Sequence, residues 1–332
     1  MRYNARPFFQ DAIMTQLLSA LTDTKLAAEL LSAGELVAVP TETVYGLAAD
    51  ASNPDAVAKI FVAKGRPANH PLIVHIGDIA RLSDWARDIP PQAVLLAKAF
   101  WPGPLTLLLH KADAVSPVVT GGKDSIGIRM PAHPVLLSLL QQTGLAVAAP
   151  SANPYKKLSP TSAMQVMAGL NGRIAAVLDG GDCSVGLEST IVDLTSDTPQ
   201  VLRAGPISAG ELEAVLGVPV STPKSHNVAV PGNVKAHYQP GKPLKIFPKD
   251  ELLAALQPNA DEVICLYQSE ELAALKLSQS RQLPQDKAGY ARLLYRALFE
   301  ADALPGRQIY LEQPPQTPEW DDVNDRLRRA CS

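Results

Sequence analysis

Two cationic side chains flank a glycine in the tetrapeptide Lys64-Gly65-Arg66-Pro67, directly after an amphipathic segment. Arginine binds phosphate oxygens with two donors and lysine adds a point charge, so the pattern would suit an anion site. The same pattern is typical of a solvated basic turn, because cations at a helix C-terminus complement the helix dipole. Taken alone, the tetrapeptide favours the turn.

A second polar segment, Pro150-Ser151-Ala152-Asn153, follows the very apolar run 146–149. Polar residues at strand ends are where α/β proteins place ligands, and Ser151 and Asn153 are spaced to face one side. Because serine, asparagine and proline also form turns, an ordinary turn explains the segment equally well.

Further hydroxyls, arginines and a carboxylate are expected at other strand ends. The segment 40–47 could position an amine-bearing substrate with its two threonines and Glu42, or it could cap a short helix. Similar polar groups occur at 186–190, at 203–206, and at Ser125 and Arg129. Together they supply what a nucleotide site with a carboxylate-bearing co-substrate needs. His75 by itself is more typical of a core or turn histidine.

Several classes of protein are disfavoured. The sequence has no phosphate-binding Gly-x-x-x-x-Gly-Lys loop, no Gly-x-Ser-x-Gly elbow and no transition-metal spacing, so we expect neither a covalent nucleophile nor a metal held by side chains. Three scattered cysteines, Cys183, Cys265 and Cys331, suit a reducing cytoplasm. We expect no signal peptide, membrane span or membrane partner. The net charge of -3 gives no global attraction to a polyanion.

Short apolar runs alternate with amphipathic segments as far as about residue 216, which favours an α/β sheet with helical cover. We expect strands at 35–39, 72–76, 105–109, 126–130, 146–149, 175–178, 190–194 and 200–203. We expect helices from residue 54, at 92–100 and at 135–140, and a capping box at Ser208 with Glu211. The pattern does not determine the order of the strands.

The composition divides the chain into four parts. Residues 1–23 are expected as an N-terminal extension, 24–216 as the main domain, and 217–243 as a proline- and glycine-rich linker. Residues 244–332 are expected as a small C-terminal α/β domain of Rossmann-like type, with strands at 244–247, 263–267 and 308–311 and helices at 288–301 and 321–329. The linker contains Val234-Lys235-Ala236-His237-Tyr238, which is unusual for a passive spacer.

Ordered motifs make this sequence resemble the threonylcarbamoyl-AMP synthases, the YrdC-like family. They lie at 40–47, 64–67 with 71–75, 101–106, 127–131, 150–153, 189–190 and 203–205. The match covers roughly residues 24 to 216, and the number of motifs in order makes it specific. The segment 231–240 and the trailing domain resemble the long, two-domain form of the family.

The resemblance implies a twisted open mixed sheet that encloses a basic cavity. It implies that the amine of L-threonine is carboxylated from bicarbonate and that the carbamate attacks the α-phosphorus of ATP, releasing pyrophosphate. Mg²⁺ would enter with ATP and be held mainly by its phosphates. The product would pass to a separate transferase that makes threonylcarbamoyladenosine in tRNA.

The resemblance also assigns residues by position, with Lys64 and Arg66 as catalytic. The ATP side would comprise Lys64, Arg66, His70, Ser125, Ser151, Asn153, Ser159, Arg203 and Tyr238. Threonine would be held by Thr43, His75, Arg129, the Ala149 backbone and Ser189, with Arg129 neutralising its carboxylate. Tyr238 would close over the nucleotide, which makes the linker a lid. Ser159 could instead be a helix N-cap before Pro160.

Two other functions fit parts of the pattern. A basic cavity extended by Lys156, Lys157, Lys235 and Lys242 could bind double-stranded RNA, weakly or as the main function, although the net charge of -3 argues against it. A carbamoyl transferase of the hydrogenase-maturation type shares this domain. That type requires zinc-finger cysteines, which three scattered cysteines cannot supply.

Overall fold

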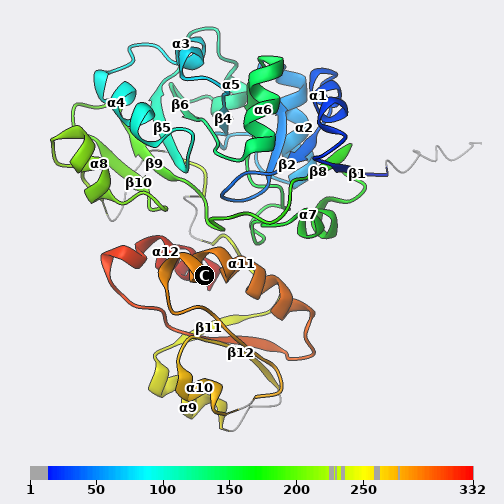
Figure 1. Cartoon of the computed structure of the whole chain (residues 1–332), viewed down its shortest axis with the longest axis vertical. Helices are drawn as coiled ribbons and strands as arrows, with labels where there is room; N and C mark the ends of the chain where they lie inside the picture. Colours follow the sequence, from blue (N-terminus) through cyan, green and yellow to red (C-terminus); the bar gives the residue numbers. More distant parts are fainter. Residues whose placement is uncertain are drawn as a thin grey trace, which may run out of the picture.

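Two β-sheets organise the computed structural model, which describes residues 14–223, 228, 230–232, 236–257, 262–275 and 277–331. The larger sheet has ten strands in the order β1-β8-β2-β3-β7-β4-β6-β5-β9-β10, and the smaller has four in the order β11-β14-β12-β13. Helices α11 and α12 lie on the side of the smaller sheet that faces the larger part of the molecule (Figure 1). The expected fold class, a mixed α/β sheet followed by a small α/β domain, is confirmed.

The larger part is built from the following elements. Its strands are β1 Gln16–Ser19, β2 Val37–Val39, β3 Gly46–Asp50, β4 Ile73–His75, β5 Leu105–His110, β6 Ser125–Arg129, β7 Val147–Ala148, β8 Ala176–Asp179, β9 Thr190–Asp193 and β10 Gln200–Arg203. Its helices are α1 Thr24–Ser32, α2 Pro54–Lys64, η1 Ile79–Arg81, α3 Leu82–Trp85, α4 Pro91–Phe100, α5 Pro117–Thr120, α6 Pro134–Thr143, α7 Ala163–Leu170 and α8 Ala209–Leu216.

Strand pairing brings distant motifs together. Strand β4 runs parallel to β6 and antiparallel to β7, so that His75 is in register with Arg129 on one side and with Val147 on the other. Strand β5 runs antiparallel to β6 and parallel to β9, which places Leu105 opposite Thr190. The motifs at the ends of β4, β6 and β9 therefore meet near one region of the sheet.

Three strands were not expected from the pattern: β1 and β3 in the large sheet and β13, Ser280–Gln282, in the small one. Strand β1 pairs in parallel with β8, so residues 16–19 of the segment expected as an extension form the edge of the large sheet. Strand β3 begins at Gly46, inside the motif 40–47, and its sequence of glycine, leucine, alanines and aspartate has low strand propensity. Burial between β2 and β7 outweighs that propensity, because strand preference depends strongly on packing context.

Helix α2 positions the Lys64–Arg66 segment, and local sequence signals define both ends of the helix. The side chain of Asn53 accepts from the backbone N–H groups of Asp55 and Ala56 at the start, where Pro54 occupies the first turn. Gly65 ends the helix with a left-handed φ of 64°. One face packs into the core through fully buried side chains such as Ile60, while Val62 is 83% exposed.

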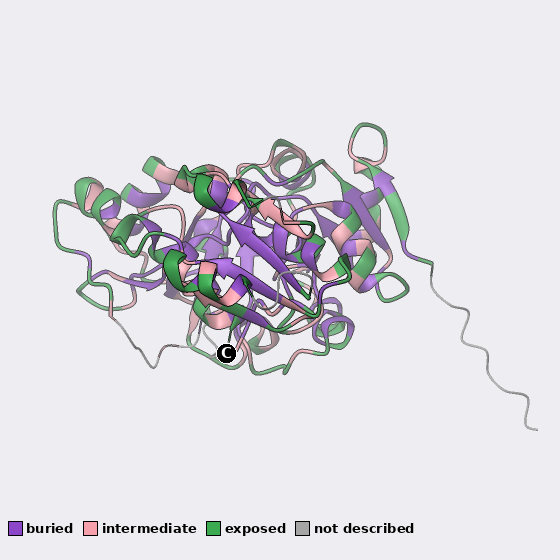
Figure 2. Ribbon diagram, turned by 90° about the horizontal axis from the view of Figure 1, so that it is seen from below, coloured by how far each residue is buried: buried purple, intermediate pink, exposed green. Residues whose placement is uncertain are grey.

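The small domain is a parallel sheet with helices on both faces, which buries the two central strands, β12 and β14, more completely than the edge strands (Figures 1 and 2). Its elements are β11 Leu244–Phe247, α9 Lys249–Leu256, β12 Val263–Tyr267, α10 Glu270–Ala273, β13 Ser280–Gln282, α11 Lys287–Ala303, β14 Gln308–Glu312, η2 Pro318–Trp320 and α12 Asp321–Ala330. Helices α11 and α12 cover one face, and α9 and α10 cover the other. Within the described ranges, no helix combines the length and apolarity needed to cross a bilayer.

The buried face of α2 should determine the stability of the large domain. We expect Ile60→Ala to lower the free energy of unfolding by about 2 to 5 kcal/mol, because it removes a buried side chain and leaves a cavity. Val62→Ala, on the exposed face of the same helix, should change it by less than about 0.5 kcal/mol. Denaturant unfolding followed by circular dichroism measures both values, and equal effects of the two changes would contradict this packing.

Candidate functional site

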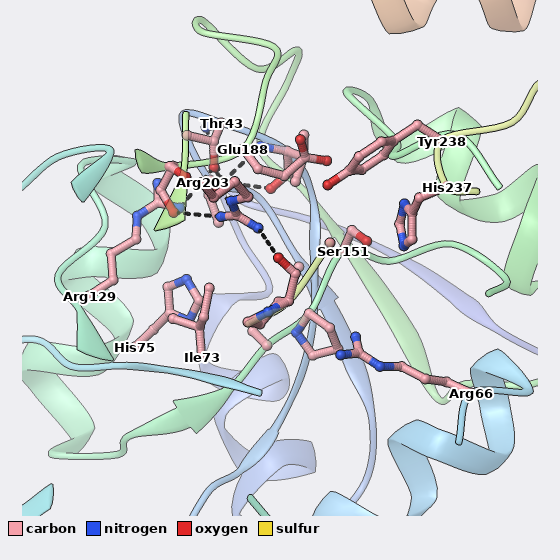
Figure 3. Close-up of a pocket in the computed structure, with 18 residues that line it drawn as sticks. Thr43, Arg66, Ile73, His75, Arg129, Ser151, Glu188, Arg203, His237 and Tyr238 are labelled. Carbon is pink, nitrogen blue, oxygen red and sulfur yellow. Dashed lines mark hydrogen bonds between the residues drawn. The ribbon is translucent and has the colours of Figure 1, made fainter. Parts of the chain in front are cut away.

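A pocket lies where the ends of β2, β4, β6, β9 and β10 meet the linker (Figure 3). Nine of the residues expected from the sequence line it: Arg66, Ser151, Arg203, Tyr238, Thr43, His75, Arg129, Ala149 and Ser189. All five residues expected for threonine are in this group, together with four expected for ATP. Polar segments that looked like separate turns in the sequence thus share one cavity.

Arg129 is held rigidly on one side of the pocket. Its guanidinium donates to Glu42 Oε1 at 2.5 Å, to Thr43 Oγ1 at 3.0 Å and to the Gly103 carbonyl at 3.1 Å. Glu42 is buried and also accepts from the backbone N–H of Ala132. Glu42 therefore orients Arg129, a role that the sequence reasoning did not assign although it placed Glu42 in a site motif.

Ser189 and Arg203 form a second fixed group. Arg203 donates to the Ser189 hydroxyl and to the Ser189 carbonyl, each at 3.0 Å, and to the carbonyl of Pro231 in the linker at 3.0 Å. The hydroxyls of Ser189 and Thr106 are 2.7 Å apart. The bond to Pro231 connects the sheet directly to the linker.

Lys64 and Asn153 lie behind the pocket lining. The Lys64 Nζ donates to the backbone carbonyls of Ser151 and Asn153 and so supports the loop after β7. The Asn153 amide donates to the carbonyls of Pro154 and Lys157, while its buried Oδ1 has no partner among the described residues. Both side chains organise the backbone of the Ser151 segment.

Besides Lys64 and Asn153, three further residues expected on the ATP side lie outside the pocket lining. His70 packs edge-on against Tyr155, with ring centroids 5.6 Å apart. Ser159 donates to Glu188 Oε1 at 2.6 Å and is buried. Ser125 begins β6, at the opposite end of that strand from Arg129. Their contacts with ATP remain predictions.

The cations expected on the ATP side form no direct salt bridge with a described carboxylate. Lys64, Arg66 and Arg203 are each at most intermediate in exposure, and the described residues place no carboxylate oxygen within 4.0 Å of them. Burial lowers the pKa of Lys64 well below its usual value, with the neighbouring Arg66 adding to the effect, and burial lowers that of Arg66 to about 10. Lys64 and Arg203 are buried and Arg66 is half-buried. A group of such cations without a direct carboxylate partner favours an anionic ligand, because such a ligand would add negative charge beside them.

The linker contributes two aromatic rings to the pocket. His237 and Tyr238 line it, with ring centroids 4.1 Å apart, and Tyr238 adopts a left-handed φ of 59° (Figure 3). Burial lowers the pKa of His237 to about 3 and raises that of Tyr238 to about 12. The sequence reasoning named Tyr238 as a site residue and quoted His237 without a role.

Glu188 is a pocket residue that the sequence reasoning did not assign. It lies in the quoted motif 186–190, is buried, and faces the ring of Tyr238 in Figure 3. Its carboxylate accepts from Ser159 and from Tyr295 and Arg326 of the small domain. The available signal was a carboxylate between the glycine and the hydroxyls of a strand-entry motif. Its two partners in the small domain, however, lie more than a hundred residues away in the chain.

Fold and pocket together define a two-domain α/β protein with a ligand site at strand ends, lined by three arginines and several hydroxyls and covered by an interdomain linker. A family model described as "Telomere recombination" matches residues 29–205. A second, described as "Threonylcarbamoyl-AMP synthase, C-terminal domain", matches residues 207–332.

Known proteins support the same assignment. The threonylcarbamoyl-AMP synthase of Bacillus subtilis is 50% identical over 226 residues, which cover 66% of this chain and 65% of that protein. The one of Pyrococcus abyssi is 39% identical over 321 residues, 92% of this chain and 93% of that protein. The crystal structure of P. abyssi Sua5 complexed with L-threonine superposes with a TM-score of 0.87 at 37% identity, covering 96% of this chain and 97% of that one.

The chain belongs to the threonylcarbamoyl-AMP synthase family, in its two-domain form. The resemblance read from the ordered motifs is thereby confirmed, as is the expected enzyme class, a nucleotidyltransferase that uses ATP for the threonylcarbamoyladenosine modification of tRNA. Direct binding of RNA by this chain remains a prediction.

Two buried histidines should make the folded state sensitive to acid. Burial lowers the pKa of both His75 and His237 to about 3, with Arg129 adding to the effect at His75. The unfolded chain therefore binds more protons below about pH 6.5, so stability falls as the pH is lowered, by about 2 kcal/mol per histidine between pH 7 and pH 5. We expect His75→Gln and His237→Gln each to flatten this dependence in urea unfolding. An unchanged slope in both variants would contradict it.

Proposed function

We propose that this chain condenses L-threonine, bicarbonate and ATP to threonylcarbamoyl-adenylate and pyrophosphate. The observation that carries the proposal is a set of cations that form no direct salt bridge with a described carboxylate, the buried Lys64 and Arg203 and the half-buried Arg66, beside a pocket of fixed hydroxyls. Phosphates are the anions that adenylation brings to such a site, and charge also develops on the leaving pyrophosphate. Fixed cations stabilise both without a side-chain nucleophile.

Threonine binds, in this proposal, on the side of Arg129. Arg129 neutralises the carboxylate, while Thr43, Ser189 and the Ala149 backbone orient the hydroxyl and amine. His75 is neutral at physiological pH, because burial holds its pKa at about 3, so it acts through shape and hydrogen bonding. The P. abyssi structure with bound L-threonine supports the presence of a threonine site in this family.

ATP lies, in this proposal, against Lys64 and Arg66 as the catalytic cations. The further ATP-side residues are His70, Ser125, Ser151, Asn153, Ser159, Arg203 and Tyr238. Two buried polar atoms, Arg66 Nε and Asn153 Oδ1, have no partner in the described part of the chain and would gain one from a bound nucleotide. Mg²⁺ enters with ATP as part of the substrate and is held mainly by the ATP phosphates.

The chemistry requires a dry, basic cavity. A carbamate decomposes readily and a mixed anhydride hydrolyses, so both intermediates must be protected from water. We infer that the sheet encloses a basic cavity and that the linker 217–243, through His237 and Tyr238, acts as its lid. The burial of both rings against the pocket supports this role.

The domain assignment follows from the same reasoning. Residues 24–216, joined by the edge strand β1, form the catalytic domain, and 244–332 form the small domain. The product passes to a separate transferase that modifies tRNA, and the reaction takes place in the cytoplasm. Weak RNA binding would assist this transfer.

Release of pyrophosphate tests the reaction directly. With ATP and Mg²⁺, we expect release that requires both L-threonine and bicarbonate, because the carbamate is the nucleophile. Serine should support it at least about tenfold less well, because it lacks the threonine methyl group that fills an apolar contact. Release that is independent of threonine or of bicarbonate would contradict the proposal.

The catalytic cations give a second test. Lys64→Met and Arg66→Met should each lower turnover at least about tenfold, because each removes a charge that stabilises phosphate oxygens. Lys59→Met is the matched control, since Lys59 lies on the same helix but pairs with Glu35 at the surface. Steady-state kinetics and thermal unfolding of all three decide the matter: normal turnover in both site variants would rule out the assignment.

A further inference from the structure

The last helix of the small domain places a fully buried arginine against two motifs of the large domain. The Arg326 side chain is 0% exposed. Its Nε donates to Glu188 Oε2 at 2.9 Å, and its terminal nitrogens donate to the carbonyls of Ala204 at 2.9 Å and of Glu188 at 3.4 Å. One guanidinium thus joins the segment before β9 to the segment after β10. Each segment carries a pocket residue, Ser189 in the first case and Arg203 in the second.

Glu188 transmits this contact into the pocket. Its carboxylate also accepts from the Tyr295 hydroxyl of α11 at 3.1 Å and from Ser159 at 2.6 Å. Burial raises the pKa of Glu188, but Arg326 and Arg203 outweigh that effect and hold the pKa at about 2. The carboxylate therefore remains charged at neutral pH and orients its donors; it does not carry a proton.

The side chains of Tyr295 and Arg326 also support the lid. The ring of Tyr238 stacks on Tyr295, with centroids 5.7 Å apart and an interplanar angle of 27°. The guanidinium carbon of Arg326 lies 5.6 Å from the centroid of the Tyr238 ring, within cation–π range. The backbone N–H of His237 donates to the carbonyl of Arg329 on the same helix at 3.1 Å. Helices α11 and α12 thus support the ring of Tyr238 and the backbone of His237.

Tight packing keeps Glu188 in this position. Gly186 adopts a φ of 85°, and a Cβ at this position would lie 2.5 Å from the Cα of Arg292 in α11. Leu187 is 0% exposed and belongs to an apolar cluster formed mainly by the small domain, with Leu294 and Leu298. The segment 186–188 of the large domain is therefore docked into the small domain.

We propose that Arg326 and Tyr295 are positioning residues for nucleotidyl transfer, through which the small domain completes the ATP side of the pocket. The inference rests on the proposed function and assigns the small domain a part in it. Arg326 acts on Ser159 and Arg203 through Glu188. It acts on Tyr238 directly, by contacting its ring. On the threonine side, Arg129 is held separately, by its pairing with Glu42.

This separation of the two sides gives the test its readout. We expect Arg326→Met to lower kcat/KM for ATP by about 100-fold, because it leaves the Glu188 carboxylate buried without its main partner. Arg326→Lys keeps the charge and should recover about tenfold of that loss. The dissociation constant for L-threonine, measured by calorimetry without ATP, should stay within about twofold of the wild-type value in both variants.

Two further variants make the test specific. Tyr295→Phe keeps the ring under Tyr238 but removes one donor to Glu188, so we expect the KM for ATP to rise about threefold. Arg296→Met is the matched control: Arg296 joins the domains at the surface, 2.7 Å from Asp182 and 45% exposed, away from the pocket. Its kinetic constants should equal those of the wild type. Thermal unfolding of every variant reports the folded fraction.

The outcomes are distinguishable. If Arg326 were merely structural, its variants would lower the concentration of active enzyme and leave the KM for ATP unchanged, which would overturn the inference. Equal losses in Arg296→Met and Arg326→Met would also overturn it. If Arg326→Met does not fold, Arg326→Lys and Tyr295→Phe decide, and a wild-type KM for ATP in both counts against the inference. Wild-type protein that releases pyrophosphate without threonine and bicarbonate would overturn the proposed function itself.

Discussion

Positive charge buried at strand ends is the constraint on which the rest of this structure depends. Lys64 is held by the carbonyls of Ser151 and Asn153, and Arg203 is held by the carbonyls of Ser189 and Pro231. A carbonyl satisfies an N–H donor but leaves the net charge in place. The site is therefore rigid and still cationic, which is the state that an anionic substrate stabilises. Each supporting carbonyl belongs to a loop or linker segment, so these segments must adopt one backbone arrangement for the cations to be tolerated.

The few buried carboxylates near the pocket have a different task. Glu42 pairs with Arg129 at 2.5 Å, and Glu188 pairs with Arg326 at 2.9 Å. In both cases a carboxylate fixes the direction of an arginine and accepts further hydrogen bonds from neighbouring groups. Burying an ion pair gains little stability by itself, because desolvation offsets the attraction. The role of both pairs is therefore better explained by geometry than by stability, since each pair orients side chains around the pocket.

Linker and small domain extend the site beyond the large sheet. His237 and Tyr238 reach the pocket from the linker, and they rest on α11 and α12. A change that displaced the small domain would therefore move the two linker rings, and it would also move Glu188. The linker rings and the Glu188 segment are thus mechanically connected. This arrangement gives a physical reason for the two-domain form of the family, in which the second domain adds contacts that the large sheet cannot make alone.

The sequence by itself determined the local features. The start of α2 at Pro54, the apolar strands and the ordered motifs are encoded by residues close in the chain, so short-range propensity and hydrophobic period were enough to predict them. Strand order, the edge strand β1 and the partners of Glu188 were decided by the tertiary structure. Glu188 and Arg326 are 138 residues apart, and Glu42 and Arg129 are 87 apart. No local pattern encodes such pairs, because their geometry exists only after the sheet has formed and the small domain has docked against it.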